Sequence, residues 1–173
     1  MPFDDAFEVP PAPARADRSF EDLYRDHALD VYRYALVLTR NVSEAEDVTA
    51  ETFERGLRAW QRGRGPGTTP LPWLFTIARH LATDRWRHAT RAIRHMVFES
   101  TRDADTSLVE GQIWLDALTH ILPSRQREVV VLRYKQDLSD AEVGSLMGLT
   151  ESGVRSLAAR AIATLRKHPE VWQ

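Results

Sequence analysis

Residues 139–167 have the pattern of two helices joined by a tight turn. Ser139 and Glu142 have the spacing of a capping box, in which each side chain accepts a hydrogen bond from the backbone N–H of the other residue. Gly148 suits the left-handed residue that ends a helix, and Thr150 suits the cap of the next helix. The stretch is therefore predicted to form a helix, a break at 148–150 and a second helix.

The second helix is predicted to run from Val154 to His168 and has two faces at about 100° per residue. Its apolar face is made by Val154, Leu157, Ala158, Ala161, Ile162 and Leu165. Its other face carries Ser152, Arg155, Ser156, Ala159 and Arg160. A DNA-binding helix-turn-helix needs this arrangement, because an apolar back fixes the helix while short polar side chains and Arg meet base edges and phosphates. A helical hairpin with a solvated face fits the same spacing.

Composition excludes several classes of protein. The chain has 173 residues, 43% of them apolar and 28% charged, which fits one ordinary soluble domain or two small ones. No apolar run reaches about 18 residues, so no membrane span is expected. The absence of cysteine excludes disulfides and thiolate metal sites and favours a reducing, cytoplasmic location. Residues 1–18 are acidic and Pro-rich, unlike a secretory signal, and are predicted to be a disordered tail.

Catalytic and metal-binding motifs are lacking in the sequence. It has no nucleophile-elbow Ser motif, and its six histidines are scattered without a carboxylate cluster at zinc-like spacing. The Gly-rich stretch 62–70 lacks the terminal Gly-Lys-Ser/Thr of a nucleotide-binding P-loop. We therefore expect no enzyme, no cofactor and no metal site.

The small net charge of −2 hides a strong segregation of charge. Residues 1–60 carry 13 acidic and 7 basic side chains, whereas residues 61–100 carry 2 acidic and 7 basic ones. Such a chain can present an acidic surface to one partner and a basic surface to another.

Two helices are predicted in the acidic part. The first covers about 20–39, with Ser19 or Asp17 as its cap, and the second follows a capping box of Ser43 and Glu46 and runs to about 61. The charged residues of the second helix, among them Asp47, Glu51 and Glu54, lie away from its apolar stripe. On composition alone this is a solvated charged face.

A third helix is predicted from Leu71 to about His95, after a loop at 62–70 that contains three Gly and two Pro. One side of this helix is apolar. The other is basic and carries a tryptophan that we expect to be exposed: Trp73, Thr76, Arg79, His80, Thr83, Asp84, Arg87, Arg91 and Arg94. Because Arg follows a phosphate backbone and an aromatic ring stacks on an unpaired base, this face favours nucleic-acid binding over a solvated surface.

Residues 96–107 lack periodicity and are predicted to be a flexible linker. Helices are predicted beyond it at about 107–121 and 125–134, then a turn at 135–137 and the helix-turn-helix; no stretch alternates like a strand. The predicted fold is all-α, with two small helical domains. They are residues 19–95 and residues 108–173, and the second contains the helix-turn-helix.

Together these segments resemble bacterial RNA polymerase sigma factors, above all the small two-domain type called extracytoplasmic-function sigma factors. The resemblance covers nearly all of residues 20–167. Residues 43–53 (SEAEDVTAETF) resemble the family's core-polymerase-binding helix. Residues 72–80 (PWLFTIARH), with Asp84 and Arg85, resemble its −10-element helix. Residues 122–130 (LPSRQREVV) and the helix-turn-helix resemble its −35-binding domain.

The resemblance implies a promoter-specificity subunit that binds core polymerase, reads the −35 duplex and melts the −10 DNA. Asp47, Glu51 and Glu54 would dock on the clamp helices of the polymerase β′ subunit. The melted −10 strand would meet Arg64, Trp73, Thr76, Arg79, His80 and Arg87, and loop 62–70 would hold a flipped base. The −35 duplex would meet Ser152, Arg155, Ser156, Ala159 and Arg160. The polymerase β flap and an anti-sigma factor would be further partners.

Two other functions stay open at this point. A self-standing helix-turn-helix repressor or activator would bind DNA without polymerase, although the second basic face at 73–94 disfavours it. A structural helical adaptor would tolerate charge reversal at Arg155 and Arg160, whereas both DNA-binding functions predict a loss of about 1–3 kcal/mol for each base contact removed.

Overall fold

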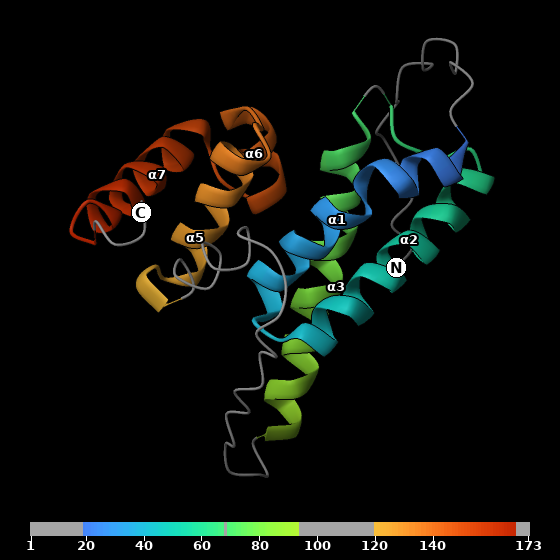
Figure 1. Cartoon of the computed structure of the whole chain (residues 1–173), viewed down its shortest axis with the longest axis horizontal. Coiled ribbons are helices and arrows are strands. Elements are labelled where there is room, and N and C mark those ends of the chain that lie inside the picture. Colours follow the sequence, from blue (N-terminus) through green and yellow to red (C-terminus); the bar gives the residue numbers. More distant parts are fainter. Residues whose placement is uncertain (1–18, 68, 94–119, 169–173) are drawn as a thin grey trace, which may run out of the picture.

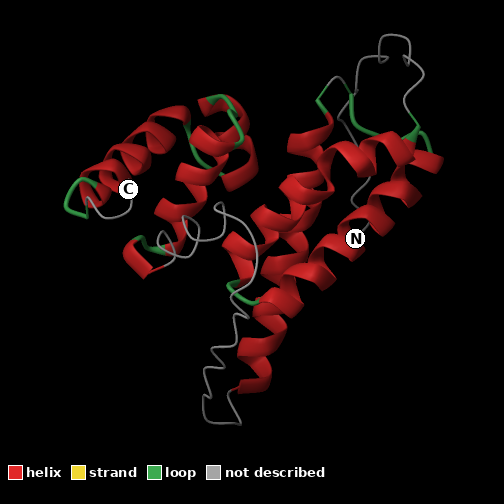
Figure 2. Cartoon of the chain, in the orientation of Figure 1, coloured by secondary structure: helices red, strands yellow, loops and turns green. Residues whose placement is uncertain are grey.

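A computed structural model describes residues 19–67, 69–93 and 120–168, with the side chains of these residues except those of 86–93. Every regular element in these residues is a helix, as the sequence predicts (Figure 2). The elements are α1 (Phe20–Thr39), α2 (Val42–Gln61), α3 (Pro70–Ile93), α5 (Ser124–Val130), the π-helical turn η1 (Val131–Lys135), α6 (Asp140–Met147) and α7 (Glu151–Leu165). None of the helices in the described ranges is long and apolar enough to cross a bilayer.

The helices form two units that pack against each other (Figure 1). The N-terminal unit is α1, α2 and α3, and each of these helices contacts the other two. The C-terminal unit is α5, η1, α6 and α7. Helix α1 lies between α2 and the C-terminal unit, so that α5 packs on α1 and α6 on α3.

Local signals account for the start of the first two helices. Ser19 caps α1: its hydroxyl accepts from the backbone N–H of Asp22 at 3.1 Å, and its own N–H donates to the Asp22 carboxylate. The expected cap of α2 by Ser43 is wrong, because the side chain of Asn41 accepts from the N–H of Glu44 at 2.9 Å. Helix α2 therefore starts two residues earlier and includes Ser43 in its first turn.

The core of the N-terminal unit combines aliphatic residues with edge-on aromatic contacts. The ring of Phe20 lies 6.3 Å from that of Phe53 and 5.9 Å from that of Trp60, both in T-shaped contacts. The ring of Tyr34 packs at 4.6 Å against Phe75, and both side chains are fully buried. Such pairs add stabilisation to the burial of large apolar surfaces, so they fix the angle between α1 and its neighbours.

Trp73 of α3 is less exposed than the sequence predicts. It is half-buried and packs against the core. Its ring passes over Gly56 of α2, where a Cβ would lie 3.4 Å from the ring edge. Exposure of the large apolar surface of a tryptophan to water is unfavourable. One side of the Trp73 ring is therefore used for packing.

The helix-turn-helix has the predicted caps. Ser139 and Glu142 form a capping box at the start of α6, and Thr150 caps α7 by accepting from the N–H of Gly153 at 3.1 Å. Gly148 ends α6 with φ of 65°, a left-handed conformation that glycine adopts without a Cβ clash. Helix α7 has the predicted length but runs from Glu151 to Leu165, so it begins and ends three residues earlier than predicted.

Several predicted segments lie outside the described residues. They are the tail (1–18), the linker (96–107), and the predicted helix at 107–121 apart from its last residues. The predicted helix at 125–134 corresponds to α5 and η1, in which the last turn widens into a π-helix.

Candidate nucleic-acid interface

The polar face of α7 is open to solvent. All five residues predicted for duplex binding are exposed there: Ser152, Arg155, Ser156, Ala159 and Arg160. The opposite side is held in place by burial of Val154, Ala158, Ala161 and Leu165. The structure therefore places these five side chains on one exposed helix face, the arrangement that a major groove can accept.

Arg155 is positioned by two carboxylates. Its Nη1 lies 3.4 Å from Asp140 Oδ2, at the start of α6, and 3.5 Å from Glu151 Oε2, one turn earlier on α7. Asp140 also pairs with Arg133 Nε of η1 at 3.0 Å. The carboxylate of Asp140 thus bridges η1 and α7, and it orients an arginine that still has more than half of its side chain exposed.

The predicted −10 surface on α3 is less open. Thr76 and His80 are exposed, Trp73 is half-buried, and Arg64 is exposed on the loop that follows α2. Arg79 points into the contact between the two units: its Nε donates to Glu128 Oε1 of α5 at 2.8 Å. The side chain of Arg87 lies outside the described residues.

A hollow of about 270 Å³ lies between α6 and the loop that precedes α3. Gly65 and Gly67 of the loop, with Trp73 and Thr76 of α3, form one wall. Glu142, Ser145 and Leu146 of α6 form the other. Helix α6 therefore stands over the place that the resemblance assigns to a flipped base.

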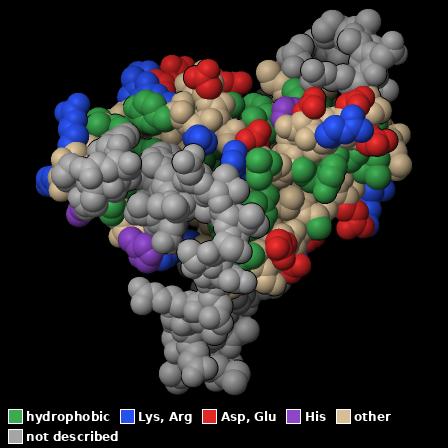
Figure 3. Space-filling view, viewed as in Figure 1, with side chains coloured by type: hydrophobic (Ala, Val, Ile, Leu, Met, Phe, Trp, Pro, Cys, Tyr) green, Lys and Arg blue, Asp and Glu red, His purple; other side chains and the backbone are tan. Residues whose placement is uncertain are grey.

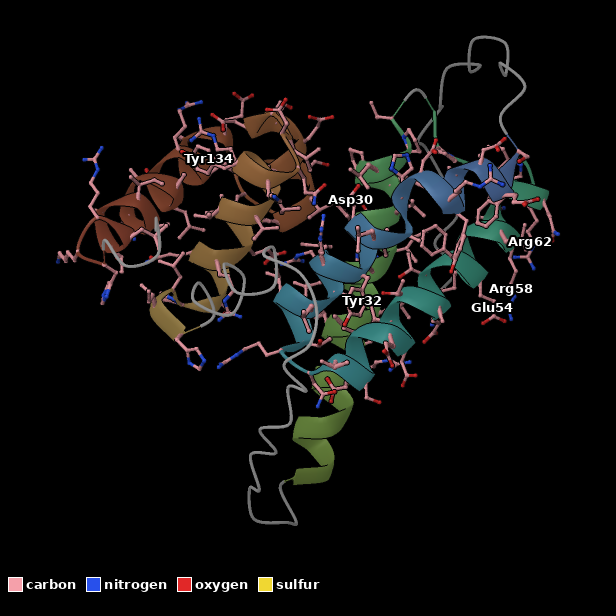
Figure 4. The ribbon with its side chains drawn as sticks, in the orientation of Figure 1. Asp30, Tyr32, Glu54, Arg58, Arg62 and Tyr134 are labelled. Carbon is pink, nitrogen blue, oxygen red and sulfur yellow. The ribbon has the colours of Figure 1, made fainter. Side chains whose placement is uncertain are left out.

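The acidic face of α2 is a network of ion pairs. Arg85 of α3 reaches Asp47 Oδ2 at 3.2 Å and Glu51 Oε2 at 3.1 Å, and Arg55 donates to Glu51 Oε1 at 2.6 Å. Further along α2, Glu54 pairs with Arg58 one turn later, and Figure 4 shows Glu54, Arg58 and Arg62 along the outer side of this helix. Acidic and basic side chains lie next to each other on this part of the surface (Figure 3).

These contacts change the protonation of both partners. Burial opposes ionisation of Glu51, but the hydrogen bonds from Arg55 and Arg85 outweigh it, so the pKa of Glu51 lies below its usual value. Burial likewise opposes the charge on Arg85, and Glu51 and Asp47 raise its pKa in spite of it. Glu51 is therefore a charged residue tied to α3, while Asp47 and Glu54 present most of their side chains to solvent.

Sequence reasoning missed the residues that hold these surfaces in place. Arg85 was assigned only to the motif that resembles the −10-element helix, and Asp140, Tyr34 and Glu128 were given no role of their own. Glu128 and Tyr34 are 94 residues apart in the chain, so no helical spacing signals their contact. Asp140 lies 15 residues before Arg155, and its position in the first turn of α6 predicts only a favourable interaction with the helix dipole.

No group of three or more metal-ligating side chains occurs in the described part of the chain. The candidate sites described above are three surfaces: a polar helix face, a partly covered basic face and an acidic face.

Comparison with known families agrees with this geometry. The family described as "Sigma-70 region 2" matches residues 23–92, and the family described as "Sigma-70, region 4" matches residues 120–167. The first range contains most of α1, all of α2 and most of α3, and the second contains α5 to α7.

Proteins that are similar to this chain over most of their length are RNA polymerase sigma factors. The chain is 35% identical over 156 residues to the ECF RNA polymerase sigma factor SigL of Mycobacterium tuberculosis, covering 83% of this chain and 85% of that protein. It is 36% identical over 161 residues to the RNA polymerase sigma factor CarQ of Myxococcus xanthus, covering 88% of this chain and 90% of that protein.

A solved structure has the same fold. The sigma factor RpoE from Bartonella quintana, determined in complex with the anti-sigma factor NepR, matches with a TM-score of 0.71 and 22% identity over 88% of this chain and 96% of that one. The family matches, the relatives and the arrangement of the helices agree. The chain therefore belongs to the extracytoplasmic-function (ECF) family of RNA polymerase sigma factors, and it acts as a promoter-specificity subunit of that enzyme.

Proposed function

We propose that this sigma factor divides promoter recognition between two helices: α7 reads the −35 duplex and α3 captures the melted −10 strand. The observation that carries this division is the difference between the two faces. The five polar positions of α7 form an exposed ridge suited to a groove, whereas the α3 face lies beside a loop-lined hollow suited to single bases. Duplex DNA is read in its grooves, and unpaired bases are read in pockets and on aromatic rings.

On the −35 side, Arg155 and Arg160 would donate hydrogen bonds to guanine edges or phosphates. The hydroxyl groups of Ser152 and Ser156 would form hydrogen bonds with either strand. The exposed methyl group of Ala159 fits the C5-methyl group of thymine. Asp140 holds the Arg155 guanidinium near the ridge, which lowers the entropy that this long side chain loses on binding.

On the −10 side, Trp73, Thr76, Arg79 and His80 would meet bases that have left the duplex, with Arg64 and Arg87 on the phosphates. Unstacked bases gain contacts that a duplex cannot offer, so binding energy opens the strands and no hydrolysis is needed. This role makes the protein a non-catalytic subunit without a cofactor.

The acidic face of α2 is our proposed dock for the clamp helices of the polymerase β′ subunit, with the β flap as the dock for the C-terminal unit. Glu54 is the best placed residue of this face, because its carboxylate is paired within α2 and 58% of its side chain is exposed. Asp47 and Glu51 also hold α3 in place through Arg85, so a substitution of either residue would affect both polymerase binding and the packing of α3.

Transcription with purified core polymerase and a promoter library tests this function. Glu54→Lys is expected to weaken binding to core polymerase and to leave α7 binding to duplex DNA unchanged. Glu21→Lys is the matched control, because Glu21 on α1 is also exposed and paired one turn later, with Arg25 at 3.2 Å. An absence of core binding and of promoter-specific transcript with the wild-type chain would refute the proposal.

A self-standing repressor or activator is not favoured, because the family match covers the −10-type unit as well as the helix-turn-helix. The regulation of related proteins supports a further partner. RpoE of Bartonella quintana was solved in complex with the anti-sigma factor NepR, and CnrH was solved in complex with the cytosolic domain of CnrY. We propose an anti-sigma factor for this chain too, and a cytoplasmic location, where polymerase and promoter DNA are found.

A further inference from the structure

The two units are joined by a buried polar contact that we call the interdomain latch, made by Tyr34 of α1, Arg79 of α3 and Glu128 of α5. The hydroxyl of Tyr34 donates to Glu128 Oε1 at 2.7 Å, and Arg79 Nε donates to the same oxygen at 2.8 Å. Only 7% of the Glu128 side chain is exposed, and Tyr34 is fully buried. Both of these donors to the carboxylate come from the N-terminal unit, so separating the units would return it to water.

The latch belongs to a longer contact along α1. Asp30, Tyr34 and Val37 lie on one stripe of this helix at i, i+4 and i+7. Gln136 donates to Asp30 Oδ1 at 3.4 Å, and Arg127 Nη1 donates to the carbonyl oxygen of Val37 at 3.1 Å. Figure 4 shows Asp30 on the side of α1 that faces the C-terminal unit. The contact therefore joins the units through hydrogen bonds at three positions of α1.

The latch uses an arginine that our proposed function needs for DNA. Burial opposes the charge on Arg79, but the Glu128 carboxylate raises the pKa of Arg79 above its usual value, which marks a guanidinium committed to this anion. A carboxylate and the acceptor atoms of an unpaired base are alternative partners for the same N–H donors. The hollow beside α6 adds steric cover, because Glu142 and Ser145 face Trp73 and Thr76 across it.

We propose that Glu128 competes with the −10 strand for Arg79. In the free protein Glu128 binds the Arg79 guanidinium, and α6 covers the base-capturing surface until the two units separate. This inference rests on the proposed −10 role of α3. A buried ion pair gives little net stability, because desolvation offsets the attraction between the charges, so the latch can be specific and still open readily. The α7 face stays exposed in the latched form.

Two measurements on the full chain test the latch. Since the chain has no cysteine, Ala50→Cys on α2 and Ala163→Cys on α7 give two exposed positions for spin labels. Glu128→Gln keeps the size of the side chain and removes its charge, and it is expected to lengthen and broaden the distance between the labels. Asp137→Asn, which removes an exposed charge from the same unit, is the control and is expected to leave the distance unchanged.

The second measurement is the affinity for a short fluorescent single-stranded DNA of random sequence, compared with random duplex DNA. If about nine molecules in ten are latched, Glu128→Gln is expected to bind the single strand roughly tenfold more tightly. Duplex affinity should stay the same, and adding Arg79→Gln should remove the gain. Tyr34→Phe leaves Arg79 and Glu128 in place and removes one donor; a smaller change in the same direction is expected, and it replaces Glu128→Gln if that variant does not fold.

An unchanged distance in folded Glu128→Gln would overturn the latch, and a longer distance without tighter single-strand binding would overturn the competition with DNA. The distance measurement needs neither DNA nor polymerase. A chain that opens on loss of the Glu128 charge but drives no promoter-specific transcription would therefore contradict the proposed function and leave the latch intact.

Discussion

The two DNA-binding surfaces proposed for this protein differ in how they are presented. The face of α7 is complete and exposed, and its arginine at 155 is held by carboxylates of its own unit. The face of α3 lies against the other unit, which takes Arg79 and stands over the loop at 65–67. A duplex-reading surface is thus ready in the free chain, whereas the strand-capturing surface becomes complete after a rearrangement. The difference suits a subunit that captures single-stranded DNA only after it has joined the polymerase.

Locking the two units together should have the largest effect. Cysteines at positions 30 and 136, whose native side chains are 3.4 Å apart, can be bridged with a short bismaleimide. We expect the bridged protein to lose promoter opening with core polymerase, because α6 cannot leave α3, and to keep its affinity for duplex DNA. The same variant treated with a monofunctional maleimide is the control, and full transcription by the bridged form would show that the covered face is not needed.

Removing the arginines of α7 should affect duplex DNA alone. Arg155→Ala and Arg160→Ala are each expected to lower the free energy of duplex binding by about 1–3 kcal/mol. Binding to single-stranded DNA is expected to remain, which a titration with both probes measures. Arg166→Ala, at an exposed position just beyond α7, is the matched control. Equal losses for both kinds of DNA would mean that the two surfaces do not divide the promoter.

Gly144 supports the exposed surface from behind. A Cβ at this position would lie 2.7 Å from the carbonyl oxygen of Leu149, in the turn between α6 and α7. Gly144→Ala is expected to lower the free energy of unfolding by about 1–3 kcal/mol, since overpacking forces the backbone to shift. Chemical denaturation of this variant beside Ser145→Ala, at the exposed neighbouring position, measures the effect. If the two variants are equally stable, the turn has room that the structure does not indicate.

Acid should slightly lower the free energy of unfolding of both units. Arginines hold the pKa of Glu51 below its ordinary value of 4.5, and hydrogen bonds from the Ser139 side chain and backbone do the same for Glu142. A carboxylate whose folded pKa is lowered stabilises the protein above its unfolded pKa, and this contribution is lost as pH falls through the folded pKa. Below about pH 4.5 the free energy of unfolding should therefore fall, by less than about 1 kcal/mol for each such exposed pair.

Urea unfolding of Glu51→Gln and Glu142→Gln across this pH range measures the contribution of each unit to the acid sensitivity. Each variant should have a flatter pH dependence than the wild type, because the group that loses its charge is missing. A wild-type slope in both variants would assign the acid sensitivity to other carboxylates.

Features that depend on neighbours within one helical turn could be predicted from the sequence. The caps at Ser19, Ser139 and Thr150, the left-handed Gly148 and the two faces of α7 all follow from spacings of three or four residues. The family could also be recognised from three motifs, since their order and spacing survive in the linear chain.

The ion pairs between helices, and the surfaces that are covered, depend on the packing of the helices against one another. Arg85 fastens Asp47 and Glu51 from more than 30 residues away, and Glu128 meets Tyr34 across 94 residues. Helical periodicity tells which side of a helix is polar, but it does not tell what packs against that side. The packing of whole helices selects the partner, so the contact between Glu128 and Arg79 could not be predicted from helical periodicity.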